Sequence, residues 1–510
     1  MQRRHGVAVL LLISVACGSQ HVPSLTGGHP CVRARARQVP STHAVAQKAS
    51  EPSLAKSPPE WDTATWLNQW YPVGWAEDFE VNALTKVTLF DTDFCVTRRS
   101  GDLPPVALHD ACPHRLASLS EGRVTATGLV QCAYHGWAFD GETGACADVP
   151  QAPRPSGAAE DAASPALGCG ARAVPCAIAS ELVWILPGGA DAFAAGAPRA
   201  PVPPPELRDG SGYRLASKGV RDLPVDFTLL LENILDYDHG PFAHQAAPFD
   251  CYSGSAEHPQ KVAESVPHEG EAPGPRPWRV RMETEPVPKM TGRVGTAAAL
   301  PARDKTGARL TATSTFTAPC GLTTGRRQED GTSSFLTFFF CTPTGVGRSR
   351  FIAGSAAGPG SKMPKLPRAF VNVFLNRFLD QDSHLLATQQ PHVLAAEFAA
   401  KAEGRPFRRA KLYQHRSPGE KLLIRLEQFL DATVPAVPGR YALLPRDVSA
   451  EGAAAVARRA FESPPRSVTL DRFAQHTAIV PASLRWHRNL GIASWALAAA
   501  ATALAAWAAK

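Results

Sequence analysis

The apolar positions of this chain predict strands in its first half and a long helix in its second half. The segments Lys86–Arg98 and Leu182–Leu186 combine β-branched and other apolar residues in the manner of strands. Residues 373–390 instead carry a stripe at helical spacing, made of Leu375, Phe378, Leu379, Leu385, Leu386 and Gln389. The aromatic run Phe335–Phe340 reads equally well as a pocket lining and as a core strand.

The N-terminal apolar run is short. Val7–Val15 follows Arg3 and Arg4, and it cannot span a bilayer, so it predicts the hydrophobic part of a signal peptide. No Asp or Glu occurs before Glu51, and the stretch up to residue 50 is basic and carries Ser and Thr. Together these features predict a presequence over residues 1–50 that addresses a plastid bounded by extra membranes. A plain secretory signal with a disordered neck is the alternative.

The C-terminal apolar run is longer. Leu490–Ala509 contains 20 residues without a charge, and Arg485, Arg488 and Lys510 flank it. The length suits a membrane span, although alanine contributes less to insertion than leucine or isoleucine. We expect a transmembrane anchor over residues 490–509, and an amphipathic or buried alanine-rich helix is the alternative.

The net charge and the cysteine content limit which binding partners and which cellular compartment the sequence indicates. The formal net charge is +7, and the presequence supplies most of it, which leaves about +1. A nucleic-acid-binding surface is therefore not indicated. The 11 cysteines stand at irregular spacings, which does not indicate a disulfide framework and favours a reducing compartment such as a stroma.

The most specific motif is Cys112-Pro-His114, then 17 residues, then Cys132-Ala-Tyr-His135. This spacing is the Rieske arrangement, in which two thiolates hold one iron of a [2Fe–2S] cluster and two imidazoles hold the other. Zinc is the competing ligand, but zinc sites usually pair like residues, whereas here each loop supplies one Cys and one His. The extra disulfide-forming cysteines of cytochrome-complex Rieske proteins are absent from both loops, so the motif resembles the oxygenase type.

A second set of candidate ligands follows. Asn233, Asp236 and His239 are three residues apart, so on a helix they project from one face. His244 is five residues beyond His239, and Gly240-Pro241 would end or kink the helix and let the second imidazole turn back. Two histidines and a carboxylate with open positions form the ligand set of oxygen-activating Fe(II).

The carboxylate ligand must come from another segment, and Asp382 is the best candidate. It lies inside the apolar stripe, seven residues after Leu375 and four before Leu386. A buried, unpaired carboxylate is costly, so a metal is a natural partner for it. Asp380 and His384 would point to other faces. A local salt bridge or a helix cap is the alternative role of Asp382.

Residues beside the histidines would support the metal rather than bind it. The carboxylate of Asp236 can orient the imidazole of His239, and it could also bridge to a histidine of the cluster. Asn233 lies close enough to tune the vacant side of the iron. Glu232 and Asp238 are expected to face solvent or to cap the segment.

These motifs resemble the pheophorbide a oxygenase family of plastids, whose relatives include chlorophyllide a oxygenase, protochlorophyllide-oxidising homologues and the Rieske component of the inner-envelope import machinery. The resemblance covers roughly residues 66–484 and rests on the segments Trp70–Val73, Cys112–Arg123, Gln131–Asp140, Pro150–Pro153, Glu232–His244 and Gln381–Asp382. Several members also carry a redox-active Cys-x-x-Cys near the C-terminus. Val480 and Ser483 occupy those positions here, so control through that pair is not possible.

The resemblance implies an α+β fold: an N-terminal all-β Rieske [2Fe–2S] domain followed by a helix-grip (START-like) domain with the mononuclear iron. The expected divisions are a presequence 1–50, a linker 51–65, a Rieske domain 66–190, a catalytic domain 206–440, an extension 441–489 and the anchor 490–509. The resemblance also implies a head-to-tail homotrimer, in which Asp236 bridges the cluster histidine of one subunit to the iron histidine of the next.

The implied function is that of a monooxygenase which uses O2 and electrons from reduced ferredoxin to oxygenate a chlorophyll-derived tetrapyrrole. Each subunit would hold one [2Fe–2S] cluster and one mononuclear Fe²⁺. The implied location is a plastid membrane, thylakoid or envelope, with the catalytic part facing the stroma. Two alternatives remain: a membrane-anchored sterol-desaturating Rieske oxygenase, and a non-catalytic redox component of a plastid translocon. The set His239, His244 and Asp382 argues against the translocon role.

Overall fold

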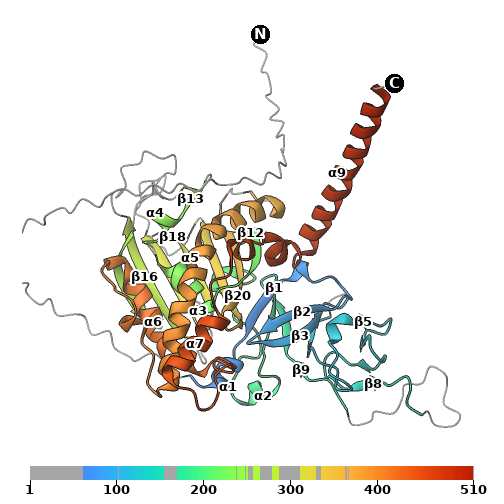
Figure 1. The fold of residues 1–510 in the computed structure, drawn as a ribbon, viewed down its shortest axis with the longest axis horizontal. Helices are drawn as coiled ribbons and strands as arrows, with labels where there is room; N and C mark the ends of the chain where they lie inside the picture. Colours follow the sequence, from blue (N-terminus) through green and yellow to red (C-terminus); the bar gives the residue numbers. More distant parts are fainter. Residues whose placement is uncertain are drawn as a thin grey trace, which may run out of the picture. The chain divides into compact units, whose positions relative to one another are not determined.

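The computed structural model describes residues 61–100, 103–153, 169–236, 238–246, 249–250, 257–264, 278–286, 311–328, 333, 335–361, 364–365 and 367–508. Residues 57–510 form one compact unit, whose elements are labelled in Figure 1. The predicted presequence over residues 1–50 lies outside the described residues, as does most of the linker 51–65.

The first part of the unit is all-β. Its three small antiparallel sheets have the strand orders β1-β11-β10, β2-β3-β4-β9 and β5-β6-β7-β8. Their strands are β1 (Tyr71–Trp75), β2 (Thr85–Leu89), β3 (Thr92–Thr97), β4 (Val106–His109), β5 (Arg123–Val124), β6 (Val130–Gln131), β7 (Ala138–Phe139), β8 (Cys146–Asp148), β9 (Ala173–Val174), β10 (Cys176–Ala179) and β11 (Leu182–Ile185). Two short helices flank them, α1 (Thr63–Leu67) and α2 (Asp191–Ala194).

The predicted strand segment Lys86–Arg98 is a hairpin. Strands β2 and β3 pair from Leu89↔Thr92 outward, and the two residues between them, Phe90 and Asp91, have φ values of 51° and 58°. A two-residue loop with positive φ at both positions matches the right-handed twist of the flanking strands. The segment Leu182–Leu186 forms β11, which is buried along its whole length. Both strand predictions are confirmed.

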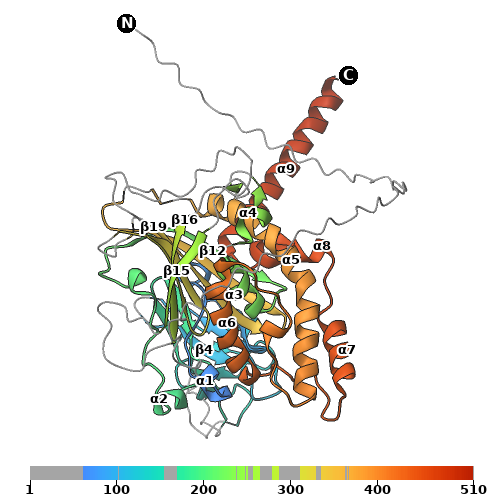
Figure 2. The same ribbon diagram turned by 90° about the vertical axis from the view of Figure 1, so that its left-hand side faces the viewer.

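The second part is built on one seven-stranded antiparallel sheet with the order β12-β20-β19-β18-β17-β16-β15. Figures 1 and 2 show α3, α5 and α6 on one side of this sheet. The bounds are β12 (Arg214–Leu223), β15 (Glu257–Glu264), β16 (Arg279–Pro286), β17 (Thr311–Thr317), β18 (Gly321–Arg327), β19 (Phe335–Gly345), β20 (Arg348–Ala357), α3 (Phe227–Leu235), α5 (Arg368–Ala402) and α6 (Lys421–Thr433). A short helix α4 (Gly240–Ala243) and a hairpin of β13 (Gln245–Ala246) and β14 (Phe249–Asp250) follow α3.

The run Phe335–Phe340 is part of β19, and its side chains alternate between the two faces of the sheet. Phe338 and Phe340 are buried, whereas Phe335 is exposed. This alternation is the period expected of a strand with one face on the core. Of the two interpretations given for the run, the structure favours the core strand.

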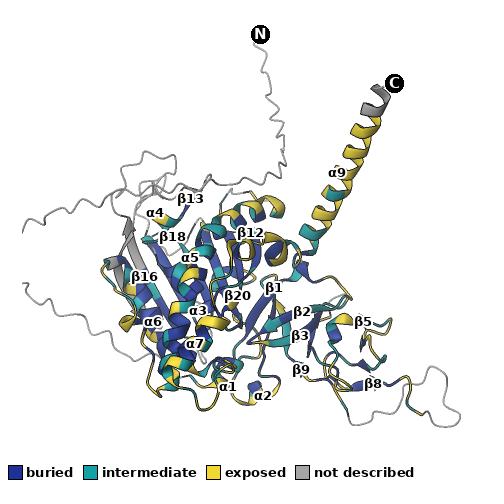
Figure 3. Ribbon diagram, viewed as in Figure 1, coloured by how far each residue is buried: buried dark blue, intermediate teal, exposed yellow. Residues whose placement is uncertain are grey.

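The two parts share one hydrophobic core, visible as the buried centre in Figure 3. Strand β1 makes three hydrogen bonds to the second part. Trp75 Nε1 donates to the carbonyl of Gly219 at 3.0 Å, and Arg350 Nη1 donates to the carbonyl of Val73 at 2.7 Å. Thr342 Oγ1 donates to the carbonyl of Pro72 at 2.7 Å. These bonds, two of them buried, fix the first part on the sheet of the second.

The predicted helical stripe is part of α5, which runs for 35 residues. Leu379, Asp382 and Leu386 are buried as expected, which places Asp382 on the covered face. Leu385 differs from the prediction because it is exposed. Its position is one residue off the face that contacts the sheet, and an exposed leucine on a helix is ordinary.

The chain ends in a helical region: α7 (Ala450–Ala460), α8 (Arg466–Thr469), a π-helical turn at Phe473–Thr477 and α9 (Pro481–Ala508). The expected transmembrane anchor over residues 490–509 requires a correction. A helix forms there, but none of the helices within the described residues is both long and apolar enough to cross a membrane. The helix is rich in alanine and begins among polar residues, so its hydropathy is modest for its length. Residues 509–510 lie outside the description.

Candidate cluster and iron sites

The first site consists of two loops with the same backbone design. In one, the amide of Cys112 donates to the carbonyl of Ala117, and the amide of Leu116 donates back to Cys112. In the other, the amide of Cys132 donates to the carbonyl of Trp137, and the amide of Gly136 donates back to Cys132. Leu116 and Gly136 have φ values of 62° and 76°, a region that costs glycine nothing. In each loop the cysteine is buried, whereas the histidine is partly exposed.

The four predicted ligands converge. Burial raises the pKa of the Cys112 thiol, the neighbouring thiol of Cys132 adds to this effect, and both cysteines are buried. The rings of His114 and His135 have centroids 4.5 Å apart and are partly exposed. Trp137 stacks on His114 at 4.6 Å with an interplanar angle of 2°. The site therefore has a buried thiol pair and an outer imidazole pair.

This arrangement fits a two-iron cluster better than one zinc ion. In a tetrahedral zinc site all ligand atoms lie within about 4 Å of one another, given bonds of about 2.0–2.3 Å. Within the described part of the chain, only one group of three His, Cys, Asp or Glu side chains has its ligand atoms within 4.8 Å, and that group belongs to the second site. His114 Nδ1 is buried without a hydrogen-bond partner, and iron would satisfy it.

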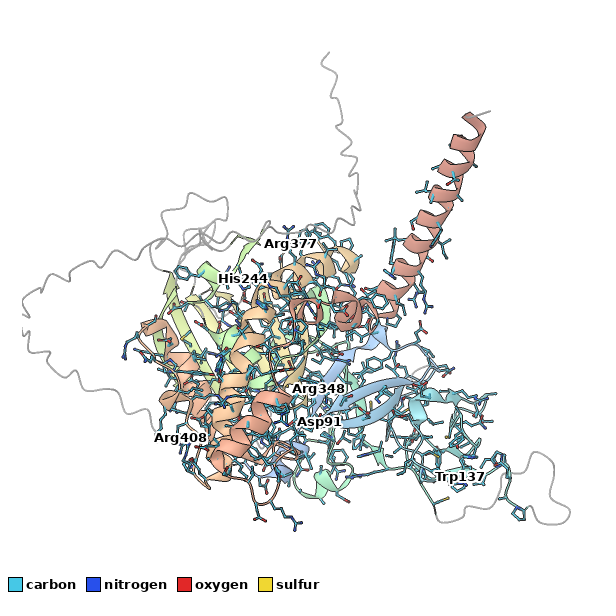
Figure 4. The ribbon with its side chains drawn as sticks, in the orientation of Figure 1. Asp91, Trp137, His244, Arg348, Arg377 and Arg408 are labelled. Atoms are coloured by element: carbon cyan, nitrogen blue, oxygen red, sulfur yellow. The ribbon has the colours of Figure 1, made fainter. Side chains whose placement is uncertain are left out.

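The second site is that group of three: His239, His244 and Asp382. His239 Nε2 lies 3.8 Å from Asp382 Oδ1, and His244 Nε2 lies 3.2 Å from Asp382 Oδ2. The two histidines frame α4, whereas Asp382 comes from the middle of α5. Figure 4 labels His244 in this region, well away from Trp137 of the cluster loops. The structure thus brings together the three residues that the sequence proposed as iron ligands.

The local path to the two histidines differs from the expected helix. Helix α3 ends at Leu235, so Asp236 and His239 lie beyond it and do not continue its face. Pro241 does not terminate that helix but starts the next one, at the first turn of α4, where its missing N–H costs nothing. The break after Leu235 and the short helix α4 together turn His244 back towards His239.

Two buried polar atoms of this site have no hydrogen-bond partner in the protein, as expected where a metal ion would bind. Asp382 and His244 are buried, and Asp382 Oδ1 and His244 Nδ1 have no hydrogen-bond partner. Burial raises the pKa of Asp382 to about 6, against the opposing effects of His239 and a hydrogen bond from Asn233. Burial also lowers the pKa of His244 to about 4, and nearby His239 adds to that effect. A cation would remove these costs, so the residues fit an iron ion.

Two neighbouring groups fix the orientation of the ligands. The side chain of Asn233 lies beside the carboxylate of Asp382 and lowers its pKa, against the larger effect of burial. His239 Nδ1 makes a short hydrogen bond to the backbone carbonyl of Asp236, while the Asp236 carboxylate accepts from the amide of Asp238 at 2.9 Å. The main chain of Asp236 therefore orients His239, a role that the sequence had given to the carboxylate. Burial raises the pKa of Asp236.

Phe378 forms one wall of the iron site. Its ring stacks on His244 with centroids 3.6 Å apart and an interplanar angle of 14°, and it lies one helical turn before Asp382. The alternative acid, Asp380, is engaged elsewhere, because it pairs with Arg221 at 2.7 Å and also with Arg472. Asp380 is therefore not placed to bind the metal.

Glu232 is not where the sequence placed it. The expectation of a solvent-facing side chain is wrong, because Glu232 is buried and pairs with Arg409 at 2.5 Å. Tyr413 also donates to it at 3.0 Å, and Arg409 binds Asp431 at 2.9 Å. This network lies directly behind Asn233. One signal was available: Glu232 interrupts an otherwise apolar helix, and a charge at such a position is rarely buried unless paired.

Comparisons with known proteins find matching families for two segments of the chain. Residues 69–167 match the Rieske [2Fe-2S] domain family, and residues 316–397 match the pheophorbide a oxygenase family. The chain is 34% identical to the pheophorbide a oxygenase of Oryza sativa subsp. japonica over 242 residues, 44% of each chain. It is 28% identical to protochlorophyllide-dependent translocon component 52 of Arabidopsis thaliana over 373 residues, 65% of this chain and 61% of that one.

A third relative is flavonoid 8-hydroxylase 2 of Ocimum basilicum, 33% identical over 207 residues, 40% of this chain and 38% of that protein. All three relatives are named as chloroplastic. The chain thus spans about half the length of the curated relatives it matches. The matches confirm the resemblance drawn from the motifs, with a Rieske domain and a pheophorbide a oxygenase segment in one chain.

A solved structure shares the fold. The terminal oxygenase of carbazole 1,9a-dioxygenase from Nocardioides aromaticivorans aligns with a TM-score of 0.50 and 18% identity, over 73% of this chain and 95% of that one. At this level of identity the likeness concerns the fold alone. It supports the order found here, an all-β Rieske domain followed by a mixed α/β part.

Proposed function

We propose that this protein is a Rieske-type non-heme iron monooxygenase that uses O2 and electrons from reduced ferredoxin to oxygenate a chlorophyll-derived tetrapyrrole. The observation that carries the proposal is the convergence of His239, His244 and Asp382, in a chain that also holds the Rieske ligand set. A Rieske domain alone would pass electrons, whereas a second site with open positions suits oxygen chemistry.

The residues of the chain prepare the site. A bound iron supplies the activation of dioxygen, which is chemistry of the metal. His239 donates from Nδ1 to the carbonyl of Asp236, so its Nε2 lone pair faces the metal position. Asn233 lies beside the Asp382 carboxylate and lowers its pKa, and Phe378 stacks on His244, which keeps water from that side.

The quaternary arrangement follows from the separation of the two sites. Trp137 beside the cluster and His244 at the iron site lie far apart within one subunit (Figure 4). We infer a head-to-tail homotrimer in which the cluster of one subunit serves the iron of the next, since a cyclic heterologous interface repeats the same contact around a ring. Asp236 would carry the contact between cluster histidine and iron histidine.

The finer assignments belong to the same proposal. The sheet from β12 to β15 with α5 along it (Figure 2) suits a helix-grip domain of START-like type. The chloroplastic names of the relatives support a plastid location. Attachment to a thylakoid or envelope membrane, with the catalytic part in the stroma, is proposed because the substrate is an apolar macrocycle that dissolves in such membranes.

The test is a turnover experiment with the full chain loaded with cluster and iron. Candidate pigments, including pheophorbide and chlorophyllide, are incubated without oxygen, then O2 and reduced ferredoxin are added and product masses are recorded. We expect a gain of oxygen in one pigment, and no product from Asp382→Ala. A flavonoid belongs in the panel, because one relative is named as a flavonoid hydroxylase.

A second candidate is a non-catalytic redox component of a plastid translocon. It is favoured by one observation: the alignment with the translocon component covers 65% of this chain, more than the alignment with pheophorbide a oxygenase. The same experiment separates the two candidates. If the cluster is reduced and reoxidised while every pigment and the flavonoid stay unchanged, the redox role replaces the enzymatic one.

A further inference from the structure

Two cysteines of the Rieske domain that the cluster does not use lie side by side. Cys146 begins β8, and Cys169 precedes the segment that leads to β9. An antiparallel bridge joins Ala145 and Gly170. Because antiparallel strands run in opposite directions, the next residue on one strand faces the previous residue on the other, so Cys146 and Cys169 are direct neighbours across the bridge.

The two thiols are close enough to react. The thiol of Cys146 donates to the backbone carbonyl of Asp148 at 3.9 Å, the adjacent thiol of Cys169 raises its pKa, and both cysteines are free. Residues directly opposite each other on antiparallel strands have Cα atoms about 4.5–5.5 Å apart. A disulfide requires about 4.4–6.8 Å, so a bond between the two sulfurs is compatible with the backbone as it stands.

We propose that Cys146 and Cys169 form a reversible thiol–disulfide site that links the two halves of the cluster-binding domain. The oxidant is a disulfide-bearing protein or peptide. The thiolate of Cys169 attacks one sulfur of the incoming disulfide and releases the first thiol. The thiol of Cys146 then gives up its proton as it attacks Cys169 Sγ, which releases the second thiol. Two electrons pass to the incoming disulfide, and the two protons leave with the released thiols.

The order of attack follows from exposure. Cys169 is partly exposed, whereas Cys146 is buried with 5% of its surface accessible. Burial raises the pKa of the Cys146 thiol to about 12, and the adjacent Cys169 adds to the effect. A buried, protonated thiol reacts slowly with an incoming disulfide, so Cys169 meets the oxidant and Cys146 resolves the mixed disulfide.

In the described part of the chain, the thiols of Cys146 and Cys169 stand as a pair and not as part of a larger group of ligands. Among the residues that the structure describes, the one cluster of three potential ligands is His239, His244 and Asp382, so no third ligand stands beside Cys146 and Cys169. An irregular set of cysteines gave no reason to expect a structural disulfide. An apposed pair of thiols with one partly exposed member is what a reversible site requires.

The location gives the bond a consequence for the cluster. Cys146 belongs to the sheet β5-β6-β7-β8, whose strand β6 leads into the ligand Cys132. Cys169 is followed by β9 in the sheet β2-β3-β4-β9, whose strand β4 leads into the ligand Cys112. A Cys146–Cys169 bond therefore fastens the two sheets that carry the two ligand loops, and the cluster should be lost more slowly from the oxidised protein.

A second apposed pair serves as the matched control. The pairing of Gly321 with Phe340 places Cys320 opposite Cys341, and the amide of Cys341 donates to the carbonyl of Cys320 at 3.0 Å. Both cysteines are buried, with exposures of 2% and 0%. The geometry is comparable, but neither thiol is open to an oxidant.

The test uses the full chain with its cluster, reduced and then exposed to oxidised glutathione without oxygen. Remaining thiols are alkylated and peptides are mapped by mass spectrometry, with the cluster followed by its visible absorption. We expect a Cys146–Cys169 cross-link with the loss of two alkylatable thiols, an intact cluster, reversal by dithiothreitol, and slower cluster loss under a chelator. Cys169→Ser should abolish the cross-link, and Cys320→Ser should leave it unchanged.

Three results would overturn the proposal. The first is a mixed disulfide of glutathione with Cys169 that Cys146 does not resolve, and the second is no reaction of either thiol while the cluster stays intact. The third is a cross-link that appears only after the cluster has been lost. If Cys146→Ser fails to hold the cluster, Cys169→Ser at the more exposed position still decides the matter. No turnover is measured, so failure of the proposed oxygenase function would not affect the result.

Discussion

The cluster site and the iron site are assembled in opposite ways. The four cluster ligands come from two loops close together in sequence, and each loop closes on itself by hydrogen bonds between its own backbone groups. The three iron ligands come from a broken helical segment and from the middle of α5, far along the chain. The cluster loops therefore depend on local turns, whereas the iron site depends on how α5 packs beside α3 and α4.

The difference also appears in burial. The cluster histidines are partly exposed beside Trp137 and Tyr134, where a redox partner can approach them. Asp382 and His244 are buried, which suits the proposed oxygen chemistry because burial excludes water. An exposed site can be specified by a few turn residues, but a buried polar site must be supported by the packing around it.

The largest expected effect tests the independence of the two sites. Asp382→Ala should empty the iron site and leave the cluster intact, because the sites share no ligand. Iron content should fall from about three to about two per subunit, with an unchanged cluster spectrum. Asp380→Ala is the control, since Asp380 pairs with Arg221. Full iron content in Asp382→Ala would remove Asp382 from the ligand set.

The second prediction addresses the cluster loops. His135→Cys should add a thiolate to the cluster, which raises its negative charge and lowers its reduction potential by a few hundred millivolts, on the order of the gap between Rieske and plant-type centres. The potential and the electron paramagnetic resonance spectrum of the reduced protein are the measurements. His114→Cys should act alike. A Rieske spectrum that survives either change would refute the ligand assignment.

The third prediction concerns the support behind the iron site. Arg409 is fully buried between Glu232 and Asp431, so Arg409→Ala leaves two buried carboxylates without their cation. The free energy of unfolding should fall by about 3–5 kcal/mol. Chemical denaturation followed by the loss of ellipticity is the measurement. Arg408→Ala, at the exposed neighbouring position labelled in Figure 4, should change it by less than about 0.5 kcal/mol. An equal loss of unfolding free energy in the two variants would show that the buried network does not contribute to stability.

The smallest effect probes the link between the two sites. Asp236→Asn should keep both metal centres, because the main chain of Asp236 orients His239 and is unchanged by the substitution. Loss of the carboxylate should slow cluster reoxidation by roughly 10–100-fold. Single-turnover mixing of the prereduced variant with oxygen and substrate measures the rate. Reoxidation at the wild-type rate with normal product would show that Asp236 is not the bridge.

The sequence allowed the metal ligands to be predicted, but not the buried residues that support them. The motifs named all seven proposed ligands, because ligand spacing is local within each loop and α5 has a readable stripe. The burial of Glu232 was missed because its partners Arg409, Tyr413 and Asp431 lie far along the chain, where no period connects them. The end of α3 at Leu235 was missed too, since the tertiary position of His239 decides it.

Helix α5 has a further consequence through its first residue. Arg368 binds the carboxylate of Asp78 in the Rieske domain through both guanidinium nitrogens, at 2.6 and 2.5 Å. Asp382 stands 14 residues later on the same helix, about 21 Å along its axis. The helix thus fixes the distance along its axis between the residue that binds the Rieske domain and the iron ligand. Each inserted residue would turn the carboxylate by about 100° away from the histidines, so the length of this stretch is as fixed as the identity of the ligand at its end.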